Sequence, residues 1–538
     1  MEISNRDIEI QRDIARHIRD EFSKRLAAGK TALAYVDTYG CQQNESDSEK
    51  LRGMLNWMGF GFTADEYEAD VIVINTCAIR ENAENRVLGN VGALVHTKNA
   101  KRSQIIVFCG CLAGVQETVD KIRVSYEQVD LVFPPVALWR FPELLYAVMY
   151  RRSVRAGGDL PPIEDIMPDY GVKYDKRGDF NESKPEDEGV RDNAAVQCDT
   201  RSQGSENADD AGLPGGDNRT LRVSKRVFYS DLSDGAIAEG IPSHRDMKVR
   251  AWLPVMYGCD NFCSYCIVPY VRGRERSRTP EAIIDEARQI VAEGYKDITL
   301  LGQNVNSYGG GNGVDFPTLI RRVNEIDGEF LIRFMTSHPK DASNDLFCAM
   351  SQSAKAARHI HLPFQAGNDR ILAMMNRGYA RSEYLERVAA AREYMPDIVI
   401  TSDVIIGFPG ETGAEFEDTL SLIEAARFDS LFIFIYSKRP GTPAAKLADS
   451  ITREEKQLRF DRLNDLQNSI SVEKHSKYMG TTVRVLADTD SQDERYPVKA
   501  RTNGGRLVHL NCDAGVIGSF VNARITHCNS WSLFGELC

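Results

Sequence analysis

Six short apolar runs lie within residues 250–445, and each is followed by a stretch in which apolar residues recur at helical spacing. This alternation constrains the fold more than any other feature of the chain. The expected strands are AWLPVMYG, DITLLG, FLIRFMT, HIHLP, IVITSDVIIG and SLFIFIYS. Strands that alternate with helices form parallel sheets, because a parallel return needs a crossover connection. Six such units predict an α/β fold with a partial (β/α)6 barrel rather than a closed eight-fold one.

Residues 31–150 repeat the same alternation. The runs ALAYVDT, DVIVINT, QIIVFCG and DLVF predict buried strands. Helical patterns begin after Asn44, Arg80, Leu112 and Phe141. This pattern predicts an open, parallel α/β domain at the N-terminal side. Ahead of it, Ile8, Ile14, Ile18 and Phe22 lie near helical spacing and predict an amphipathic helix.

The C-terminal part has a different pattern. Residues 452–477 form one charged run that predicts a helix. The stretches that follow alternate with a period of two and are separated by turns: TTVRVLADTD, YPVKARTNG, GRLVHLN and SFVNARITHC. Short strands of this kind predict a small five-stranded barrel, a fold that often binds RNA.

One segment departs from the globular pattern. Residues 156–218 hold 16 acidic and 6 basic residues and few apolar ones. Low hydrophobicity with high net charge predicts a disordered or loosely ordered acidic linker. The alternative is a regulatory or partner-binding role.

The amino-acid composition limits the class of protein and the cellular compartment that we expect. The formal charge of −12 argues against a uniformly basic nucleic-acid binder. No stretch approaches ~18 uncharged apolar residues, so we expect no transmembrane helix. The first residues carry charges throughout and do not resemble a secretory signal. Twelve cysteines in 538 residues are too sparse for a disulfide scaffold. They favour a reducing cytoplasm, where clustered cysteines indicate metal or redox chemistry.

Three cysteines cluster after the first strand of the expected barrel, in the stretch YGCDNFCSYC. Cys259, Cys263 and Cys266 place three thiolates on one tight loop. Soft thiolates at this spacing suit an iron–sulfur cluster, and a [4Fe–4S] cluster with three protein ligands keeps one iron open. An open position is typical of a catalytic rather than a structural site. The alternative is a zinc site completed by a distant fourth ligand.

A second set of cysteines follows three N-terminal strands. Cys41, Cys77 and Cys111 each lie just past the carboxyl end of a predicted strand. The carboxyl ends of parallel strands share one edge of the sheet, so these residues can converge there. The alternative is that each is an isolated buried cysteine. Cys109 competes with Cys111, but it lies within an apolar run and is expected to be a small buried hydrophobe.

Motifs quoted from the chain resemble a known family. YGCDNFCSYC looks like the cysteine motif of radical S-adenosylmethionine (radical SAM) enzymes, whose fold is a partial (β/α)6 barrel. TYGCQQNESDSE, NTCAIRENAENRV and GCLA resemble the N-terminal motifs of methylthiotransferases, as do HLPFQAGNDRILAMMNRGY and YSKRPGTPAA in the barrel. The last barrel resembles a TRAM domain. In detail the chain is most similar to MiaB-type tRNA methylthiotransferases.

The resemblance implies a chemistry. It implies two [4Fe–4S] clusters, one at Cys259, Cys263 and Cys266 and an auxiliary one at Cys41, Cys77 and Cys111. S-adenosylmethionine is implied both as methyl donor and as source of a 5′-deoxyadenosyl radical. The implied product is a methylthio group on carbon 2 of N6-isopentenyladenosine beside the tRNA anticodon. An electron donor such as flavodoxin or ferredoxin and a monomeric state complete the expectation.

Other residues are candidates for binding. Tyr265 within the cysteine motif, and Gln303 and Asp403 in the second and fifth barrel strands, are expected near the cofactor, with a structural role in the rim as the alternative. Arg272 and Arg274 follow the cysteine loop and are candidates for phosphate binding, a solvated edge being the alternative. In the last barrel, candidates for tRNA backbone contacts are Lys499, Arg501 and Arg506.

These observations predict five segments. They are a helical extension (residues 1–30), an N-terminal domain with the auxiliary cluster (31–152), the acidic insert (153–245), the radical SAM domain (246–475) and the TRAM domain (476–538). Two alternatives to the expected activity stay open at this point. One is methylthiolation of N6-threonylcarbamoyladenosine with the same clusters, and the other is a non-catalytic iron–sulfur protein that binds RNA and senses redox state.

Overall fold

The computed structural model describes residues 3–25, 29–78, 81–168, 173–174, 180–181, 226–232, 235–310 and 313–538. The chain divides into two compact units, Met1–Glu143 with Phe228–Cys538, and Leu144–Val227. Most of the stretch expected to be loosely ordered, residues 156–218, lies outside the described residues. Within the described residues, no helix is both long and apolar enough to cross a membrane.

The N-terminal sheet has the strand order β2-β1-β3-β4-β5-β8, in which β8 is the short strand Val227–Phe228 and the other five strands are parallel. The parallel strands are β1 (Leu33–Thr38), β2 (Gly61–Phe62), β3 (Val71–Thr76), β4 (Ile105–Gly110) and β5 (Leu131–Phe133). The four predicted strands are therefore confirmed, and β2 is an addition too short to show a pattern. Every residue of β3 and β4 is buried, as expected for central parallel strands covered on both faces.

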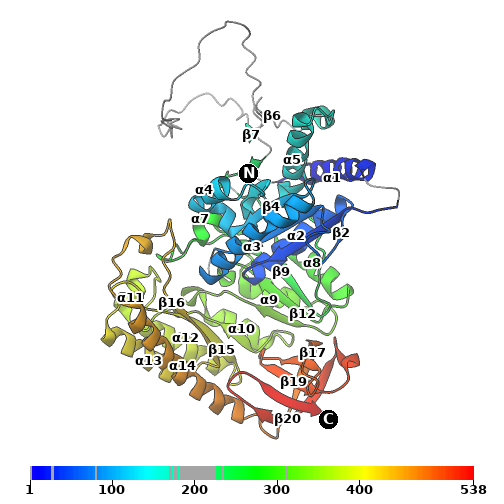
Figure 1. Cartoon of the computed structure of the whole chain (residues 1–538). Helices are drawn as coiled ribbons and strands as arrows, with labels where there is room; N and C mark the ends of the chain where they lie inside the picture. Colours follow the sequence, from blue (N-terminus) through cyan, green and yellow to red (C-terminus); the bar gives the residue numbers. More distant parts are fainter. Residues whose placement is uncertain are drawn as a thin grey trace. The chain divides into compact units, whose positions relative to one another are not determined.

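Helices of the first unit surround this sheet (Figure 1). They are α1 (Asn5–Arg25), α2 (Gln42–Trp57), α3 (Glu81–Ala100) and α4 (Gln116–Ser125), with 3-10 turns η1 (Cys111–Gly114) and η2 (Pro135–Arg140). The next helix, α5 (Phe141–Arg155), lies mostly in the second unit. The amphipathic helix is confirmed as α1, in which Ile14 and Ile18 are fully buried. The helix expected directly after Leu112 starts later, at Gln116, because the chain first makes the turn η1.

The predicted partial barrel is present in unit 1. Its six parallel strands are β9 (Arg250–Pro254), β12 (Asp297–Leu301), β13 (Leu331–Phe334), β14 (His359–His361), β15 (Val399–Ile406) and β16 (Ser430–Ile435). They form the sheets β13-β12-β9 and β14-β15-β16, which a parallel bridge between Ile332 and Ala356 connects. Since β9 and β16 are the two edges of this arrangement, the described strands leave the barrel open.

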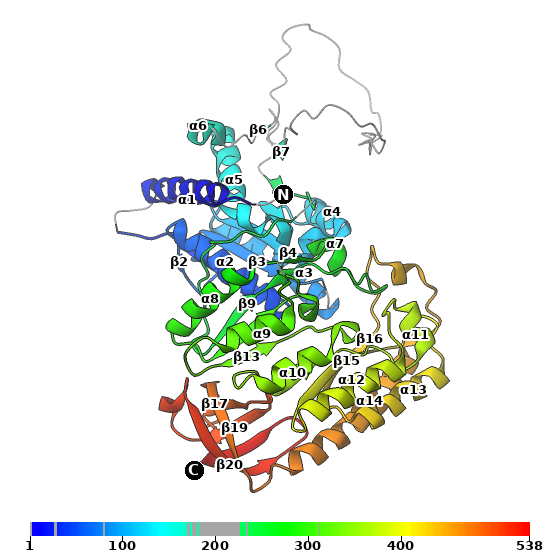
Figure 2. The ribbon, with the colours of Figure 1, turned by 180° about the vertical axis from the view of Figure 1, so that it is seen from behind.

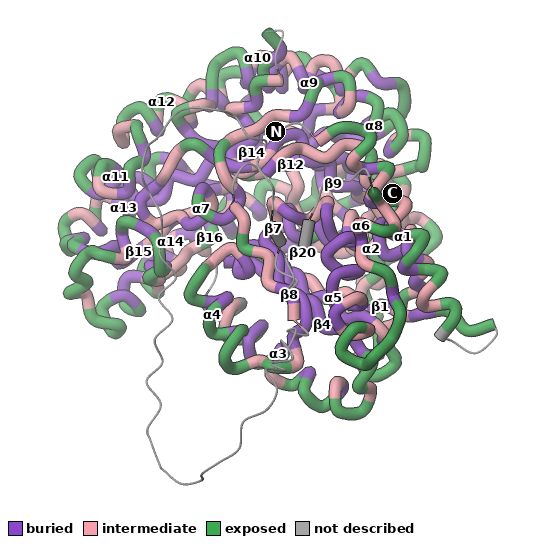
Figure 3. Tube along the Cα trace, turned by 90° about the horizontal axis from the view of Figure 1, so that it is seen from above, coloured by how far each residue is buried: buried purple, intermediate pink, exposed green. Residues whose placement is uncertain are grey.

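Helices cover the outer face of these strands (Figure 2). They are α8 (Pro280–Ala292), α9 (Phe316–Asn324), α10 (Asn344–Gln352), α11 (Asp369–Met374), α12 (Arg381–Tyr394), α13 (Gly413–Ala426) and α14 (Arg453–Ser476). The short helix α7 (Val268–Arg272) instead packs against η1 of the N-terminal domain. Capping fixes where several of the outer helices begin. At α13, Thr412 Oγ1 accepts from Glu415 N at 3.3 Å, and Thr412 N donates to Glu415 Oε2 at 2.8 Å. Figure 3 shows the buried residues gathered along strands such as β4, β9 and β12.

The last strands close into the expected five-stranded barrel, here called the TRAM barrel. Its strands are β17 (Thr482–Asp490), β18 (Val498–Thr502), β19 (Leu507–Asn511), β20 (Phe520–Cys528) and β21 (Leu533–Leu537), in the order β17-β18-β19-β21-β20. Inward residues such as Val485, Ala500, Val508 and Ile525 form its core. The strand β21 was not among the predicted runs, because Gly535 interrupts its apolar pattern.

The second unit contains few described elements. They are most of α5, α6 (Ile163–Ile166), and the antiparallel strands β6 (Lys173–Tyr174) and β7 (Phe180–Asn181). Within it, Tyr146 Oη donates to the carbonyl oxygen of Pro161 at 2.8 Å.

Candidate active site

The barrel cysteines, Cys259, Cys263 and Cys266, lie on a loop between the short strand β10 (Met256–Tyr257) and α7. The amide of Cys259 donates to the carbonyl of Gly273 at 3.3 Å, and the amide of Cys266 donates to that of Cys263 at 2.9 Å. Gly258 starts the loop at φ +78°, where a Cβ would lie 2.0 Å from a backbone oxygen. The chain therefore doubles back here only because this residue is glycine.

The segment after α11 supports the loop from one side. Ser264 N donates to the carbonyl of Met375 at 2.9 Å, and Asn376 Nδ2 donates to that of Phe262 at 3.0 Å. Arg377 is buried, and its Nη1 donates to Cys263 Sγ at 3.3 Å. The same guanidinium holds the carbonyl of Pro363 at 2.7 Å through Nη2. One cysteine of the motif is therefore fixed by a buried cation.

Burial makes two thiols of this loop, Cys259 and Cys266, harder to deprotonate. Burial, reinforced by the neighbouring cysteines, raises the pKa of Cys266 to about 12. Burial also raises the pKa of Cys259. Metal binding must release these protons, since thiolates are the ligands.

Beside the loop, the mouth of the barrel holds buried polar atoms without partners. Among the described residues, nothing pairs with Asn304 Oδ1, Ser337 Oγ, His338 Nε2 or Gln365 Oε1. All four side chains follow the carboxyl ends of β12, β13 or β14. Two residues here have a left-handed backbone, Thr336 at φ +66° and Gln365 at φ +66°. Buried polar atoms without partners are typical of ligand sites, because a ligand supplies the missing hydrogen bonds. Local backbone strain also gathers at such sites.

The N-terminal cysteines, Cys41, Cys77 and Cys111, lie at the carboxyl ends of β1, β3 and β4. Gly40 approaches so closely that a Cβ there would lie 2.9 Å from Cys77 Sγ. The Cys77 side chain donates a hydrogen bond to Cys41, which together with the charge of Arg272 outweighs burial and lowers the pKa of Cys41 to about 6. Burial raises the pKa of Cys111, although Arg272 opposes this. The predicted strand ends thus do bring the three residues together.

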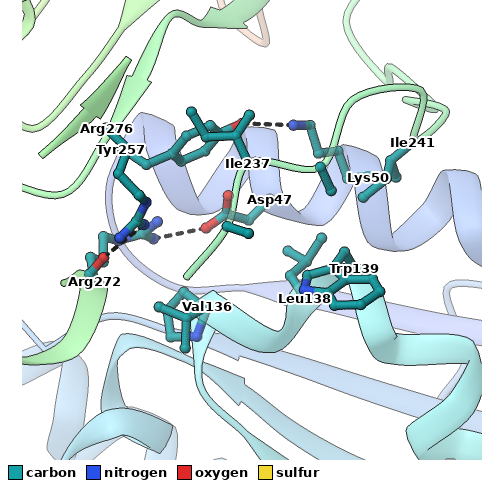
Figure 4. A pocket seen from close by; sticks show the side chains of 13 residues that line it. Asp47, Lys50, Val136, Leu138, Trp139, Ile237, Ile241, Tyr257, Arg272 and Arg276 are labelled. Atoms are coloured by element: carbon teal, nitrogen blue, oxygen red, sulfur yellow. Dashed lines mark hydrogen bonds and ion pairs between the residues drawn. The ribbon is translucent and has the colours of Figure 1, made fainter. Parts of the chain in front are cut away.

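Arg272 connects the two sets of cysteines. It is the last residue of α7, six positions after Cys266, and it is 5% exposed. Its Nε donates to Cys111 Sγ at 3.2 Å, and its Nη2 pairs with Asp47 Oδ2 of α2 at 2.8 Å. Figure 4 shows this pair beside a pocket that Lys50 and Tyr257 also line. Lys50 Nζ donates to Tyr257 Oη at 2.8 Å, a second link between α2 and the barrel.

The predicted cofactor residues occupy three different settings. The ring of Tyr265 packs against the apolar cluster around Ala366, and its hydroxyl accepts from Arg377 Nη1 at 3.4 Å. Gln303 Oε1 accepts from the amide of Gly258, and its Nε2 donates to Gln43 of α2 at 3.4 Å. Asp403 on β15 is half-buried and lies 3.3 Å from His361 Nε2. Cofactor contacts of these three residues stay a prediction.

The two arginines predicted to bind phosphate are placed differently. Arg272 is buried against Cys111 and Asp47 rather than displayed on a surface. Arg274 is exposed, pairs with Asp260 at 3.2 Å, and lies over the ring of Phe262 at 5.0 Å. Of the two, only Arg274 is open to solvent.

The predicted tRNA contacts in the TRAM barrel are also divided. Arg506 is bound to Asp429 and to Tyr478 Oη, and its side chain is 8% exposed. Arg501 pairs with Asp488 at 3.3 Å. Both border a hollow with barrel residues such as Arg333, which donates to the carbonyl of Asn503 at 2.8 Å. Lys499 instead points outward from β18, between the buried Val498 and Ala500. A role in binding tRNA stays a prediction for all three basic residues.

The donor sets fit iron–sulfur clusters. Within the described residues, no three His, Cys, Asp or Glu side chains gather closely enough to hold a single metal ion. A [4Fe–4S] cluster instead takes each thiolate on a separate iron, so its ligands surround a larger volume. Each site offers three thiols and a guanidinium donating to one of the sulfurs. The unpaired atoms at the barrel mouth match a ligand with several polar groups, as S-adenosylmethionine is.

Comparison with known proteins decides the family. Three family models match, the Radical SAM superfamily (residues 253–423), the uncharacterized protein family UPF0004 (33–134) and the TRAM domain (476–538). The tRNA-2-methylthio-N(6)-dimethylallyladenosine synthase of Acetivibrio thermocellus is 42% identical over 96% of this chain and 93% of its own length. The synthase of the same name from Alkaliphilus oremlandii is 40% identical over 95% and 93%. The chain belongs to this family of synthases.

In this synthase-family chain, two residues that support the cysteine sites were not predicted from the sequence, Arg377 and Asp47. Arg377 lies in the quoted motif HLPFQAGNDRILAMMNRGY, but the motif alone does not show that its guanidinium contacts Cys263. Asp47 lies in TYGCQQNESDSE, six positions after Cys41. A carboxylate in the first turns of a helix that follows a cysteine was the available signal, since that helix starts at the ligand edge.

Proposed function

We propose that this chain transfers a methylthio group to carbon 2 of N6-isopentenyladenosine beside the anticodon of tRNA. The observation that carries the proposal is the pairing of two cysteine sites in one unit, joined by Arg272, in a member of the synthase family. A ring C–H bond has no useful acidity, so acid–base side chains alone could not activate it. Cofactors must supply that chemistry.

The barrel cysteines would hold one [4Fe–4S] cluster, which would supply reductive cleavage of S-adenosylmethionine. The N-terminal cysteines would hold a second, which would supply a position for sulfur. The protein supplies the surroundings. Arg377 and the carbonyl of Met375 fix the barrel loop, and Gln303 ties Gly258 to α2. These contacts hold the two sites in one orientation relative to each other, which is what transfer between them requires.

The orphaned atoms at the barrel mouth would hold S-adenosylmethionine. Asn304, Ser337, His338 and Gln365 are each no more than 7% exposed, so water does not easily replace a ligand there. Burial and the charge of Arg377 lower the pKa of His338 to about 2, which keeps the imidazole neutral. His338 Nδ1 accepts from the amide of Lys340 at 3.3 Å, so Nε2 carries the proton and is a donor.

The competing substrates differ in the group on the adenine. The related synthases are named for dimethylallyladenosine, and this favours the isopentenyl over the threonylcarbamoyl substrate. A redox-sensing role without catalysis would not need the unpaired polar atoms at the barrel mouth. The electron donor, flavodoxin or ferredoxin, the cytoplasmic location and the monomeric state belong to the same proposal.

Nucleoside mass spectrometry tests the substrate. We expect the reconstituted protein, with S-adenosylmethionine, a sulfide source and a reductant, to convert isopentenyladenosine in tRNA to its 2-methylthio form. The same reaction with tRNA that carries threonylcarbamoyladenosine is the matched comparison. Methylthiolation of the second tRNA alone would overturn the proposed substrate, and methylthiolation of neither, with both clusters loaded, would overturn the proposed activity.

A row of aromatic and basic side chains crosses the outside of the TRAM barrel. Cross-strand pairs place Lys499 beside His509, His509 beside Phe534, and Phe534 beside His527. The rings of His509 and Phe534 stack at 5.0 Å, and Tyr496 lies 5.0 Å from Phe534. Aromatic rings beside a cation are typical of surfaces on which unpaired RNA bases stack. We place the tRNA contact on this row rather than at Arg501 and Arg506.

Replacing Phe534 with alanine is expected to weaken tRNA binding about tenfold, because stacking of one base contributes about 1–3 kcal/mol. Fluorescence anisotropy with labelled tRNA measures the change. His527→Ala, at an exposed position, tests the same row without touching the core. Tyr67→Ala, which removes a 55% exposed aromatic from the N-terminal domain, is the control. Equal affinities of the Phe534 variant and the unaltered protein would refute this contact surface.

A further inference from the structure

Arg272 makes a contact that catalysis by the two clusters does not by itself require. It belongs to the barrel, yet its Nε donates to the sulfur of Cys111 in the N-terminal domain at 3.2 Å. Its side chain is 5% exposed, so solvent does not screen the contact. We propose that Arg272 is a positioning residue that sets the reduction potential of the cluster held by the N-terminal cysteines. This inference rests on the proposed function, which places a cluster there.

The direction of the effect follows from charge. Reduction adds one negative charge to a cluster and its thiolates. A buried cation that donates a hydrogen bond to a ligand sulfur stabilises the reduced state more than the oxidised state. The low dielectric of the buried site strengthens that difference. Arg272 is therefore expected to raise the potential of the N-terminal cluster.

Asp47 limits this effect. Its Oδ2 lies 2.8 Å from Arg272 Nη2, and its side chain is 8% exposed. The carboxylate places a negative charge close to the same cysteines and so favours the oxidised cluster. It also holds the guanidinium in a fixed orientation, because two separate nitrogens of one planar group are occupied. Arg272 and Asp47 thus act on the potential with opposite signs.

The barrel site offers a matched comparison. Arg377 is also buried and donates to a ligand sulfur, Cys263 Sγ, at 3.3 Å. Among the described residues, no carboxylate forms an ion pair with it; its other acceptors are the Pro363 carbonyl and the Tyr265 and Tyr379 hydroxyls. Each arginine contacts one cysteine site, so each should change the potential of one cluster alone.

The contact between Arg272 and Cys111 depends on how the barrel packs against the N-terminal domain. Because α7 belongs to the barrel and α2 to the N-terminal domain, the contact exists only when the two are packed as in this structure. The potential of the N-terminal cluster therefore reports on this packing. The N-terminal cluster would therefore have the reduction potential set by Arg272 only when the barrel and the N-terminal domain are packed together.

The test uses the full chain with Cys259, Cys263 and Cys266 replaced by alanine, so that only the N-terminal cluster loads. After anaerobic reconstitution, a redox titration followed by electron paramagnetic resonance gives its midpoint potential. We expect Arg272→Gln to make reduction about tenfold less favourable, which is ~59 mV lower for a one-electron couple. Arg272→Lys keeps the charge and should lower it less. Asp47→Asn should raise the potential, a sign that simple structural damage would not produce.

Arg377→Gln in the same background is the control and should leave the midpoint unchanged. An unchanged potential in Arg272→Gln, or an equal shift in Arg377→Gln, would overturn the role of Arg272 while leaving the cluster assignment intact. Absence of iron from the parent background, by contrast, would overturn the cluster assignment and this inference together.

Discussion

Replacing Cys77 with alanine will abolish methylthio transfer to tRNA and leave the cleavage of S-adenosylmethionine intact. Cys77 is 2% exposed at the end of β3 and donates to Cys41, so its loss removes one ligand and disturbs a second. The barrel cysteines lie on a separate loop with its own support from Arg377. Iron should fall from about eight to about four atoms per chain, as expected for two four-iron clusters. Chromatography of 5′-deoxyadenosine measures the retained cleavage.

Two matched variants complete this experiment. Cys263→Ala should also leave about four irons but should abolish 5′-deoxyadenosine formation, because it removes a ligand of the other cluster. Cys109→Ala is the control, since Cys109 lies two residues before Cys111 on β4 and is buried in the sheet. It should keep about eight irons. A Cys77 variant with a full complement of iron, or a Cys109 variant that loses half, would contradict the assignment of the N-terminal cysteines.

The parallel strands, and the positions of Cys41, Cys77 and Cys111 at their carboxyl ends, could be predicted because their signals are local. A buried parallel strand is apolar along most of its length, as VIVI and IIVFC are in β3 and β4, and its carboxyl end marks the ligand edge. The cysteine positions then follow from the strands. The same reasoning could not predict β2 or β21, because two residues or an internal glycine carry too little pattern.

The arginines could not be placed from the sequence alone. Arg506 and Arg501 have the composition of an RNA-binding surface, but their carboxylate partners are Asp429, from the end of the partial barrel, and Asp488. Arg272 finds Asp47 at a separation of 225 residues. Charge predicts that such a side chain has a partner. Only the fold determines whether that partner is a phosphate, a carboxylate or a thiolate.

The same limit applies to the residues next to the barrel cysteines. Tyr265 was expected near the cofactor because it lies inside the motif, and this contact stays a prediction. The structure adds that its ring packs into an apolar cluster and that its hydroxyl accepts from Arg377. The position of a residue within a motif therefore predicts that it lies near the site. It does not predict as securely in which direction its side chain points. The contacts that hold the loop come from a segment more than 100 residues away, at Met374, Met375 and Arg377.

Replacing Gly110 with alanine will remove the N-terminal cluster without replacing any ligand. Gly110 has φ +91°, and a Cβ there would lie 2.4 Å from Asn75 Oδ1 and 2.4 Å from the carbonyl oxygen of Thr76. The backbone cannot yield easily, because Thr76 and Gly110 are paired between β3 and β4 and Thr76 Oγ1 donates to the Cys109 carbonyl. Strain and displacement should cost about 2–4 kcal/mol of folding free energy and shift the adjacent Cys111.

The measurements are iron content, methylthiolated nucleoside and 5′-deoxyadenosine from the same preparation. We expect about four irons, no methylthiolated product and continued 5′-deoxyadenosine formation, because the barrel cysteines do not depend on the turn at Gly110. Gly89→Ala is the matched control in the same domain. Gly89 lies within α3 with nothing within 4 Å of an added Cβ, and alanine favours the helix by about 1 kcal/mol. If Gly110→Ala kept about eight irons and full transfer, Cys111 could not be held by this turn, and the placement of the N-terminal site at the strand ends would fail.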